Sequence, residues 1–156
     1  MIQRAVHGML EELQPNLWES TLERIVDYGH TFSPTIEMHA LPKLLHGEAV
    51  TIDMALTTVL AWRRGLVGAE QRDRIFAVMN LLELPSWNDL LEPRLLQDAL
   101  RETVRHRNGK QRLPLPLRIG RAVIVNDVTD AELEQAVRDL REFGSARGDA
   151  MREAAA

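Results

Sequence analysis

The chain of 156 residues is long enough for one domain with a buried core, and its lack of cysteine excludes disulfides, thiolate metal sites and a cysteine nucleophile. Its formal net charge of −4 argues against a nucleic-acid partner, because phosphate binding requires a basic face. No apolar run reaches the roughly 20 residues of a membrane-spanning helix and no signal peptide is recognisable, so we expect no membrane partner and a cytoplasmic location.

Helical spacing of apolar residues dominates the start of the chain. Residues 2–13 carry one apolar stripe, which Pro15 ends. A second helix is predicted over residues 22–29. A third is predicted from Pro34 to Ala40, since proline is tolerated in a first helical turn. The first stripe begins almost at the N-terminus, which suits either a piece of a larger body or an independent domain with a short tail.

The stretch 47–65 is the predicted centre of the fold. Its apolar residues occur on nearly all sides of the helix, so we expect this helix to be buried. Asp53 interrupts it, and a buried aspartate without a partner is costly. We therefore expect Asp53 to face a polar pocket or a cationic partner.

The second half of the chain alternates helices with one short β element. Helices are predicted over 69–82 and 92–105, followed by a cationic loop over 105–112 with an Asn-Gly turn. Two prolines make residues 113–117 extended, and 119–125 is the only strand-like stretch.

A capping box marks the last helix, because Thr129 precedes Glu132 by three residues ahead of an apolar stripe. From Gly144 onward the chain is small and polar, and we expect a frayed tail over 144–156. The predicted fold class is therefore mainly α, with one helical domain over 1–143 and a small β element near 119–126.

Two histidines, His30 and His46, lie sixteen positions apart, each beside a glycine. The second stands at the mouth of the central helix, so the two imidazoles form a plausible metal site that lacks further ligands. His7 and His39 are expected to be ordinary structural or surface residues. The sequence contains no His-Glu-x-x-His helix, no glycine-rich phosphate loop and no Gly-x-Gly dinucleotide fingerprint.

Three segments around these histidines resemble a known family. Residues 29–32 (Gly-His-Thr-Phe), 36–37 (Ile-Glu) and 45–50 (Leu-His-Gly-Glu-Ala-Val) are similar to the C-terminal, helical half of dehydroquinate synthase. That family reads Gly-His-Thr-Phe-Gly-His-x-Ile-Glu and His-Gly-Glu-Ala-Val, with two zinc histidines at the same spacing. The resemblance covers nearly the whole chain and implies that His30 and His46 are ligands of zinc, or of another divalent metal such as cobalt.

The departures from that family are informative. Where dehydroquinate synthases carry asparagine, a second histidine and lysine, this chain has Asp27, Pro34 and His106. An ungapped alignment also places Met9 and Glu23 where they carry lysine and arginine. The loss of these cationic groups suits a substrate without a carboxylate.

With these departures the chain is similar to the sedoheptulose 7-phosphate cyclases, and most to those that make 2-epi-5-epi-valiolone. The resemblance implies that Asp27 and His106 contact the substrate and help to set the stereochemical outcome. Lys110 and Arg112 are weaker candidates for phosphate contact, because a loop of this charge is more often a solvated turn.

Family members are much longer than this chain. Their N-terminal half binds NAD and supplies the third zinc ligand, a glutamate, and most lysines around the phosphate. A missing half would explain why Lys43 and Lys110 are the only lysines here. We expect the C-terminal half of a cyclase, as a split-gene subunit or a truncated chain, which needs the NAD-binding half as partner and assembles as a dimer or heterotetramer.

The implied reaction is a phosphate-eliminating cyclisation in which NAD acts catalytically. A hydroxyl is oxidised, phosphate leaves, the ketone is reduced, the ring opens and an aldol addition closes the carbocycle. Alternatives remain at this point: a 2-epi-valiolone synthase, a dehydroquinate synthase-like half, or a non-catalytic helical scaffold. Asp27 and His106 weigh against the scaffold and against a desmethyl-4-deoxygadusol product.

Overall fold

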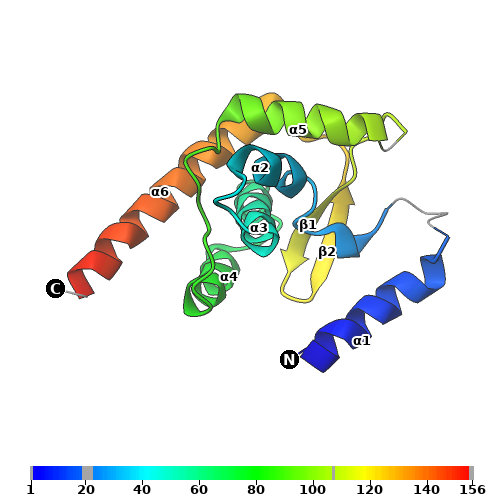
Figure 1. The fold of residues 1–156 in the computed structure, drawn as a ribbon, viewed down its shortest axis with the longest axis horizontal. Helices are drawn as coiled ribbons and strands as arrows, with labels where there is room; N and C mark the ends of the chain where they lie inside the picture. The colour runs from blue at the N-terminus through cyan, green and yellow to red at the C-terminus, as the bar shows by residue number, and fades with distance from the viewer. Residues whose placement is uncertain (1, 19–22, 107, 155–156) are drawn as a thin grey trace.

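The computed structural model describes residues 2–18, 23–106 and 108–154, with side chains described as far as Phe143 apart from that of His106. Helices dominate the fold, and one antiparallel hairpin is added to them (Figure 1). The elements in chain order are α1 (Ile2–Leu13), η1 (Gln14–Asn16), η2 (Ile25–Asp27), α2 (Ser33–Ala40), α3 (His46–Arg63), α4 (Ala69–Leu81), α5 (Pro93–His106), β1 (Leu113–Arg118), β2 (Arg121–Val125) and α6 (Asp130–Ala154). The mainly helical fold class is thus confirmed.

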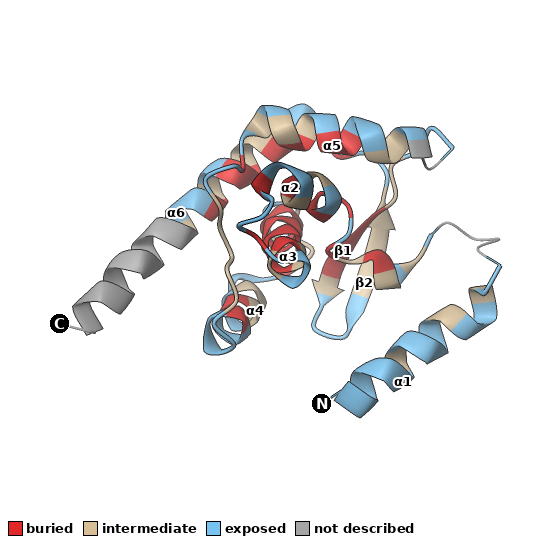
Figure 2. Ribbon diagram, in the orientation of Figure 1, coloured by how far each residue is buried: buried red, intermediate tan, exposed pale blue. Residues whose placement is uncertain are grey.

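Helix α3 is the centre of the molecule. It contacts α2, α4, α6 and β1, and Figure 2 shows its buried residues enclosed by the other elements. Its middle is apolar on every side, so Ile52, Leu56 and Val59 are fully buried. The prediction of a buried central helix is confirmed, and it gives His46, the first residue of α3, a rigid support.

The β element is larger than expected, because the proline-rich segment is a strand as well. Strand β1 pairs with β2 in antiparallel register, with Leu113 opposite Val125 and Leu115 opposite Val123. Pro114 and Pro116 are compatible with pairing, since alternate residues of a strand turn their N–H groups to the same edge and a two-stranded sheet leaves one edge unpaired. The strand prediction over 119–125 therefore described only half of the hairpin.

The prediction of a second helix was wrong. A helix over 22–29 was expected, but the described part of this segment holds only the single 3₁₀ turn η2, with Arg24 extended at φ −125°. Helix α6 continues past Gly144 to Ala154, and the fraying expected over 144–156 stays a prediction. Residues 145–154 contain no proline and several good helix formers, and a glycine costs a helix only about 1 kcal/mol.

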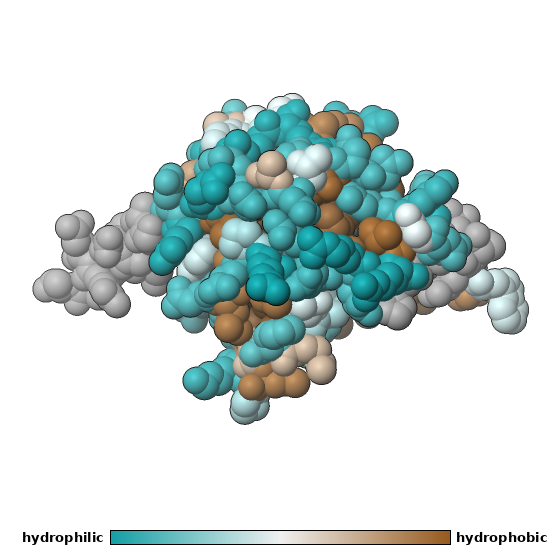
Figure 3. Space-filling view, turned by 90° about the horizontal axis from the view of Figure 1, so that it is seen from above, coloured by the Kyte–Doolittle hydropathy of each residue, from teal (hydrophilic) through white to brown (hydrophobic). Residues whose placement is uncertain are grey.

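Helix α1 forms as predicted, yet none of its residues is buried. It lies at one side of the molecule near η2 (Figure 1). Its apolar stripe faces outward, with Ile2 82% and Leu10 57% exposed. Figure 3 shows the face seen from above, where apolar patches interrupt a mostly hydrophilic surface. None of the described helices combines the length and the hydropathy that crossing a bilayer requires.

Candidate metal and substrate site

A tight turn places His30 beside the central helix. The turn follows η2, and the amide of His30 donates to the carbonyl of Asp27 at 2.9 Å. Gly29 adopts a φ of +80°, and a Cβ built on it would lie 2.7 Å from Met54 Cγ and 3.0 Å from Val50 Cγ1. Glycine is favoured here, because the backbone conformation and the close approach to α3 would both strain a residue with a side chain.

The structure brings His30 and His46 together. Their ring centroids lie 5.7 Å apart at an interplanar angle of 55°. Two imidazoles that share a zinc ion at Zn–N distances of about 2.0–2.1 Å have ring centroids roughly 5 Å apart. The pair is therefore spaced closely enough to ligate one ion with little adjustment.

Each of these rings has a hydrogen-bond partner on Nδ1. Nδ1 of His30 is 3.3 Å from the carbonyl oxygen of Tyr28, and Nδ1 of His46 is 2.8 Å from Oε2 of Glu37. Both partners are oxygens that accept a hydrogen bond from Nδ1–H, which leaves the lone pair of Nε2 for a metal. A carboxylate on the second nitrogen is the arrangement that orients a metal-ligating histidine. Glu37 had no role assigned from the sequence, and only its position in the Ile-Glu motif marked it.

The pair is not a complete metal centre within the described residues. They contain no group of three or more histidine, aspartate or glutamate side chains that could hold an ion. The side chain of His46 is 60% exposed, so the open side of the pair faces the surface. Two imidazoles fit a divalent metal in chemistry and spacing, and further ligands would have to approach from outside this part of the chain.

Asp53 has polar surroundings, as expected for a buried aspartate. It is fully buried, and its Oδ2 accepts hydrogen bonds from the amides of Phe32 at 2.6 Å and Ser33 at 2.9 Å. Burial raises the pKa of Asp53 to about 6, although these amides oppose the shift. The polar groups that it faces are the backbone amides at the start of α2 and not a cationic side chain.

Asp27 is nearly buried and forms a two-pronged ion pair with Arg24. Nε of Arg24 lies 3.2 Å from Oδ2 of Asp27 and Nη2 lies 3.0 Å from Oδ1. The side chain of Asp27 is 10% exposed. This partner was not foreseen, although an arginine three residues before an aspartate is a recognisable local signal.

The loop after α5 starts close to the histidine turn. Oγ1 of Thr103 donates to the carbonyl of Thr31 at 3.1 Å, which holds the end of α5 against this turn. The side chain of His106 lies outside the described residues. Lys110 is exposed and Arg112 is half-buried. The assignments of Asp27, His106, Lys110 and Arg112 to the substrate stay predictions.

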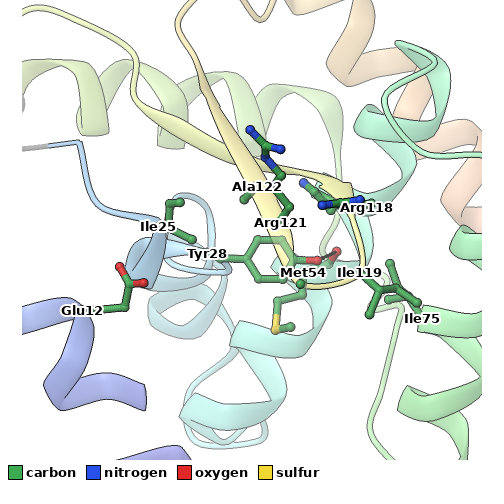
Figure 4. Close-up of a pocket in the computed structure, with 11 residues that line it drawn as sticks. Glu12, Ile25, Tyr28, Met54, Ile75, Arg118, Ile119, Arg121 and Ala122 are labelled. Carbon is green, nitrogen blue, oxygen red and sulfur yellow. Dashed lines mark hydrogen bonds between the residues drawn. The ribbon is translucent and has the colours of Figure 1, made fainter. Parts of the chain in front are cut away.

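Tyr28, two residues before His30, lines a cavity of about 450 Å³. Figure 4 shows Tyr28 and Met54 at its wall, Arg118 and Arg121 from the hairpin, and Glu12 from α1. The hydroxyl of Tyr28 is 3.1 Å from Oγ1 of Thr58, and burial raises the pKa of Tyr28. His30 and His46 are not among the residues that line the cavity.

Comparison with known proteins identifies close relatives. The chain is 67% identical over 147 residues to a 2-epi-5-epi-valiolone synthase from Streptomyces albus, which covers 94% of this chain and 36% of the relative. A 2-epi-5-epi-valiolone synthase from Actinoplanes sp. is 70% identical over 135 residues, covering 86% and 34%. The chain thus spans about a third of the length of these relatives.

A solved structure has the same fold. It is the 2-epi-5-epi-valiolone synthase of Streptomyces hygroscopicus subsp. jinggangensis 5008 with NAD⁺ and Zn²⁺ bound, at 57% identity and a TM-score of 0.89. The match covers 90% of this chain and 39% of that one. Residues 1–108 also match the family model described as 3-dehydroquinate synthase C-terminal. Because that match spans more than half of the sequence, the chain belongs to the 3-dehydroquinate synthase C-terminal family.

Proposed function

We propose that this chain forms the metal- and substrate-binding part of a sugar phosphate cyclase. The reaction converts sedoheptulose 7-phosphate into 2-epi-5-epi-valiolone with loss of phosphate. The observation that carries the proposal is 67% identity to a 2-epi-5-epi-valiolone synthase over 94% of the chain. Because that relative is much longer, we propose that activity also requires an NAD-binding half, as a separate subunit or joined to this sequence.

His30 and His46 are the proposed metal ligands, and their facing rings with occupied Nδ1 atoms support this role. A divalent ion such as zinc or cobalt, when bound, supplies a Lewis acid that polarises a hydroxyl or carbonyl oxygen. Glu37 occupies Nδ1 of His46 and so leaves Nε2 as the nitrogen for the metal. With two ligands only, the chain by itself is expected to bind zinc weakly or not at all.

Asp27, His106, Lys110 and Arg112 are proposed to bind the substrate. Both carboxylate oxygens of Asp27 accept from Arg24, and this ion pair fixes the orientation of the carboxylate. Lys110 and Arg112 supply positive charge for the phosphate. NAD, held by the other half, supplies transient oxidation and reduction.

Exposed apolar side chains around the histidine pair support a covering partner. Met38 and Leu45 are each 70% exposed and Leu41 is 58% exposed. They flank Glu37 and His46 in the sequence. We propose that the NAD-binding half covers this apolar rim and the open side of the pair, which would exclude water from the reacting groups.

The test combines this chain with the NAD-binding half of the Streptomyces albus relative, Zn²⁺, NAD⁺ and sedoheptulose 7-phosphate. Phosphate release and the NMR spectrum of the product are recorded. We expect stoichiometric phosphate and 2-epi-5-epi-valiolone from the mixture. We expect no product from either half alone.

His46→Ala in the same mixture is the matched control, and it should lower the rate by at least about a hundredfold because a metal ligand is lost. Product from the 156-residue chain alone would contradict the need for a second half. A mixture that assembles and binds NAD⁺ but gives no cyclitol would contradict the catalytic proposal. A 2-epi-valiolone spectrum would replace the product named above.

A further inference from the structure

We propose that Asp53 is the positioning residue that keeps His30 opposite His46, because it fastens the start of α2 to α3. The inference rests on the proposed function only in taking the two histidines as metal ligands. It concerns whether the protein holds the two imidazoles in a metal-binding arrangement before any ion binds.

The first observation is where Asp53 lies on α3. Asp53 follows His46 by seven residues, or two helical turns, so both side chains leave the same side of the helix. Its carboxylate reaches the amides of Phe32 and Ser33. Helix α3 therefore carries both His46, as its first residue, and Asp53, which binds the segment that follows His30.

The second observation is that α2 has no cap of its own. Phe32 occupies the N-cap position and makes no side-chain capping bond. Helix starts leave amides without intrahelical partners, and a carboxylate there is favoured by charge-assisted hydrogen bonds and by the helix dipole. Asp53 supplies from α3 what an N-cap side chain would normally supply from within the same segment.

The third observation is that the chain is held on both sides of His30. On one side Gly29 packs against Val50 and Met54. On the other side Asp53 binds Phe32, two residues after His30. The segment that carries His30 thus contacts α3 on both sides of this residue. These two contacts limit how far the backbone of His30 can move relative to His46.

A simpler role for Asp53 would be to stabilise the start of α2 as a cap, without any effect on the histidine pair. Burial raises the pKa of Asp53, so the ionised carboxylate is held at a cost. Among the described residues Oδ1 of Asp53 also has no hydrogen-bond partner. A serine or asparagine at position 32 would cap α2 without burying a charge. The experiment must therefore separate metal-site geometry from stability.

The chain is titrated with Cu²⁺-iminodiacetate, which supplies the remaining copper ligands and leaves two imidazoles to bind. Affinity and the nitrogen splittings in the Cu²⁺ electron paramagnetic resonance spectrum are measured. The binding that disappears in His46→Ala is assigned to the pair. This readout needs neither the NAD-binding half nor turnover.

Asp53→Leu, which has no acceptor, should weaken this His46-dependent binding by about tenfold or more, as changes beyond the direct ligands commonly do. Asp53→Asn keeps the shape and one acceptor oxygen but makes weaker bonds, so a loss of about threefold to tenfold is expected. Both variants should show a copper spectrum with fewer coupled nitrogens. Circular dichroism verifies that each variant is folded.

Thr129→Ala is the matched control, because Thr129 caps α6 and lies outside the site. It should lower thermal stability and leave the copper affinity within about twofold. Wild-type affinity in either folded Asp53 variant, or an equal loss in Thr129→Ala, would overturn the inference. If Asp53→Leu does not fold, Asp53→Asn decides.

The result is separable from the proposed function. If the unmodified chain binds the copper chelate through His46 and Asp53→Asn weakens that binding, the inference stands even when the mixture of halves yields no cyclitol. If the unmodified chain shows no binding that depends on His46, the pair is not arranged for a metal and the inference fails.

Discussion

Gly29 decides where His30 lies. Its φ of +80° turns the chain back onto α3, and the missing side chain lets the backbone touch Val50 and Met54. A few residues later Asp53, on the same helix α3, accepts hydrogen bonds from the amides of Phe32 and Ser33. At this scale the absent Cβ of Gly29 lets the chain just before His30 approach the helix that carries His46.

Gly29→Ala should lower the free energy of unfolding by about 2–4 kcal/mol, through a left-handed backbone and overpacking against α3. Denaturant unfolding measures the change. Gly120→Ala is the matched control, because Gly120 has a φ of +81° with no atom within 4 Å of a built Cβ. We expect it to cost only about 1–2 kcal/mol. Equal costs for the two variants would mean that contact with α3 is unimportant.

At the scale of elements, Arg64 joins the end of α3 to the start of α6. Its Nε and Nη2 donate to the two carboxylate oxygens of Glu132 at 2.7 and 2.9 Å, and its Nη1 donates to Asp127 at 2.6 Å. Glu132 also accepts from the amide of Thr129 at 2.9 Å, which completes the predicted capping box. One carboxylate thus caps α6 and ties it to the central helix.

This arrangement predicts a pH dependence. The hydrogen bond from Arg64 lowers the pKa of Glu132 from 4.5 to about 2. A group whose pKa is lower in the folded state stabilises the fold at pH values above its unfolded pKa. The stability from Glu132 is therefore complete above pH 4.5 and is lost as the pH falls toward about 2.

Glu132→Gln should lower the free energy of unfolding by about 1–2 kcal/mol at pH 7, with the difference from wild type shrinking below about pH 4. Thermal unfolding between pH 2 and pH 7 measures it. Glu134→Gln, on the same helix, should show a smaller and flatter effect. A pH-independent difference for Glu132→Gln would rule out the ionised pair with Arg64 as its cause.

At the scale of the whole molecule, the core is complete but part of the apolar surface is not covered. The core gathers around α3, whereas α1 buries none of its residues. Glu12, near the end of α1, lines the cavity that Tyr28, Met54 and the hairpin also line (Figure 4). Together with the apolar rim beside His46, this surface is where we expect the NAD-binding half to pack.

The isolated chain should therefore self-associate. Val6→Glu combined with Leu10→Glu should raise the dissociation constant of the self-associated form by about tenfold or more, because two apolar side chains no longer become buried. Sedimentation velocity across a concentration series measures this. Gln3→Glu with Gln14→Glu adds the same charge outside the stripe and should have little effect. A wild-type chain that stays monomeric at every concentration would contradict the prediction.

The sequence by itself determined the features that depend on neighbouring residues. Apolar stripes predicted α1, α3, α4 and α5, and the Thr129–Glu132 pair predicted the start of α6. The segments 29–32 and 45–50 indicated the family, and the match of residues 1–108 to its model agrees. These signals are local, so they can be recognised in the sequence without knowledge of the fold.

Only the tertiary structure decided how residues from different elements meet. The pairing of Glu37 with His46, the attachment of Asp53 to the amides of α2 and the pairing of β1 with β2 each join residues of different elements. Residue spacing does not specify such contacts, because they arise from how helices and strands pack around α3. Packing around the buried helix α3 brings the rings of His30 and His46 to within 5.7 Å of each other.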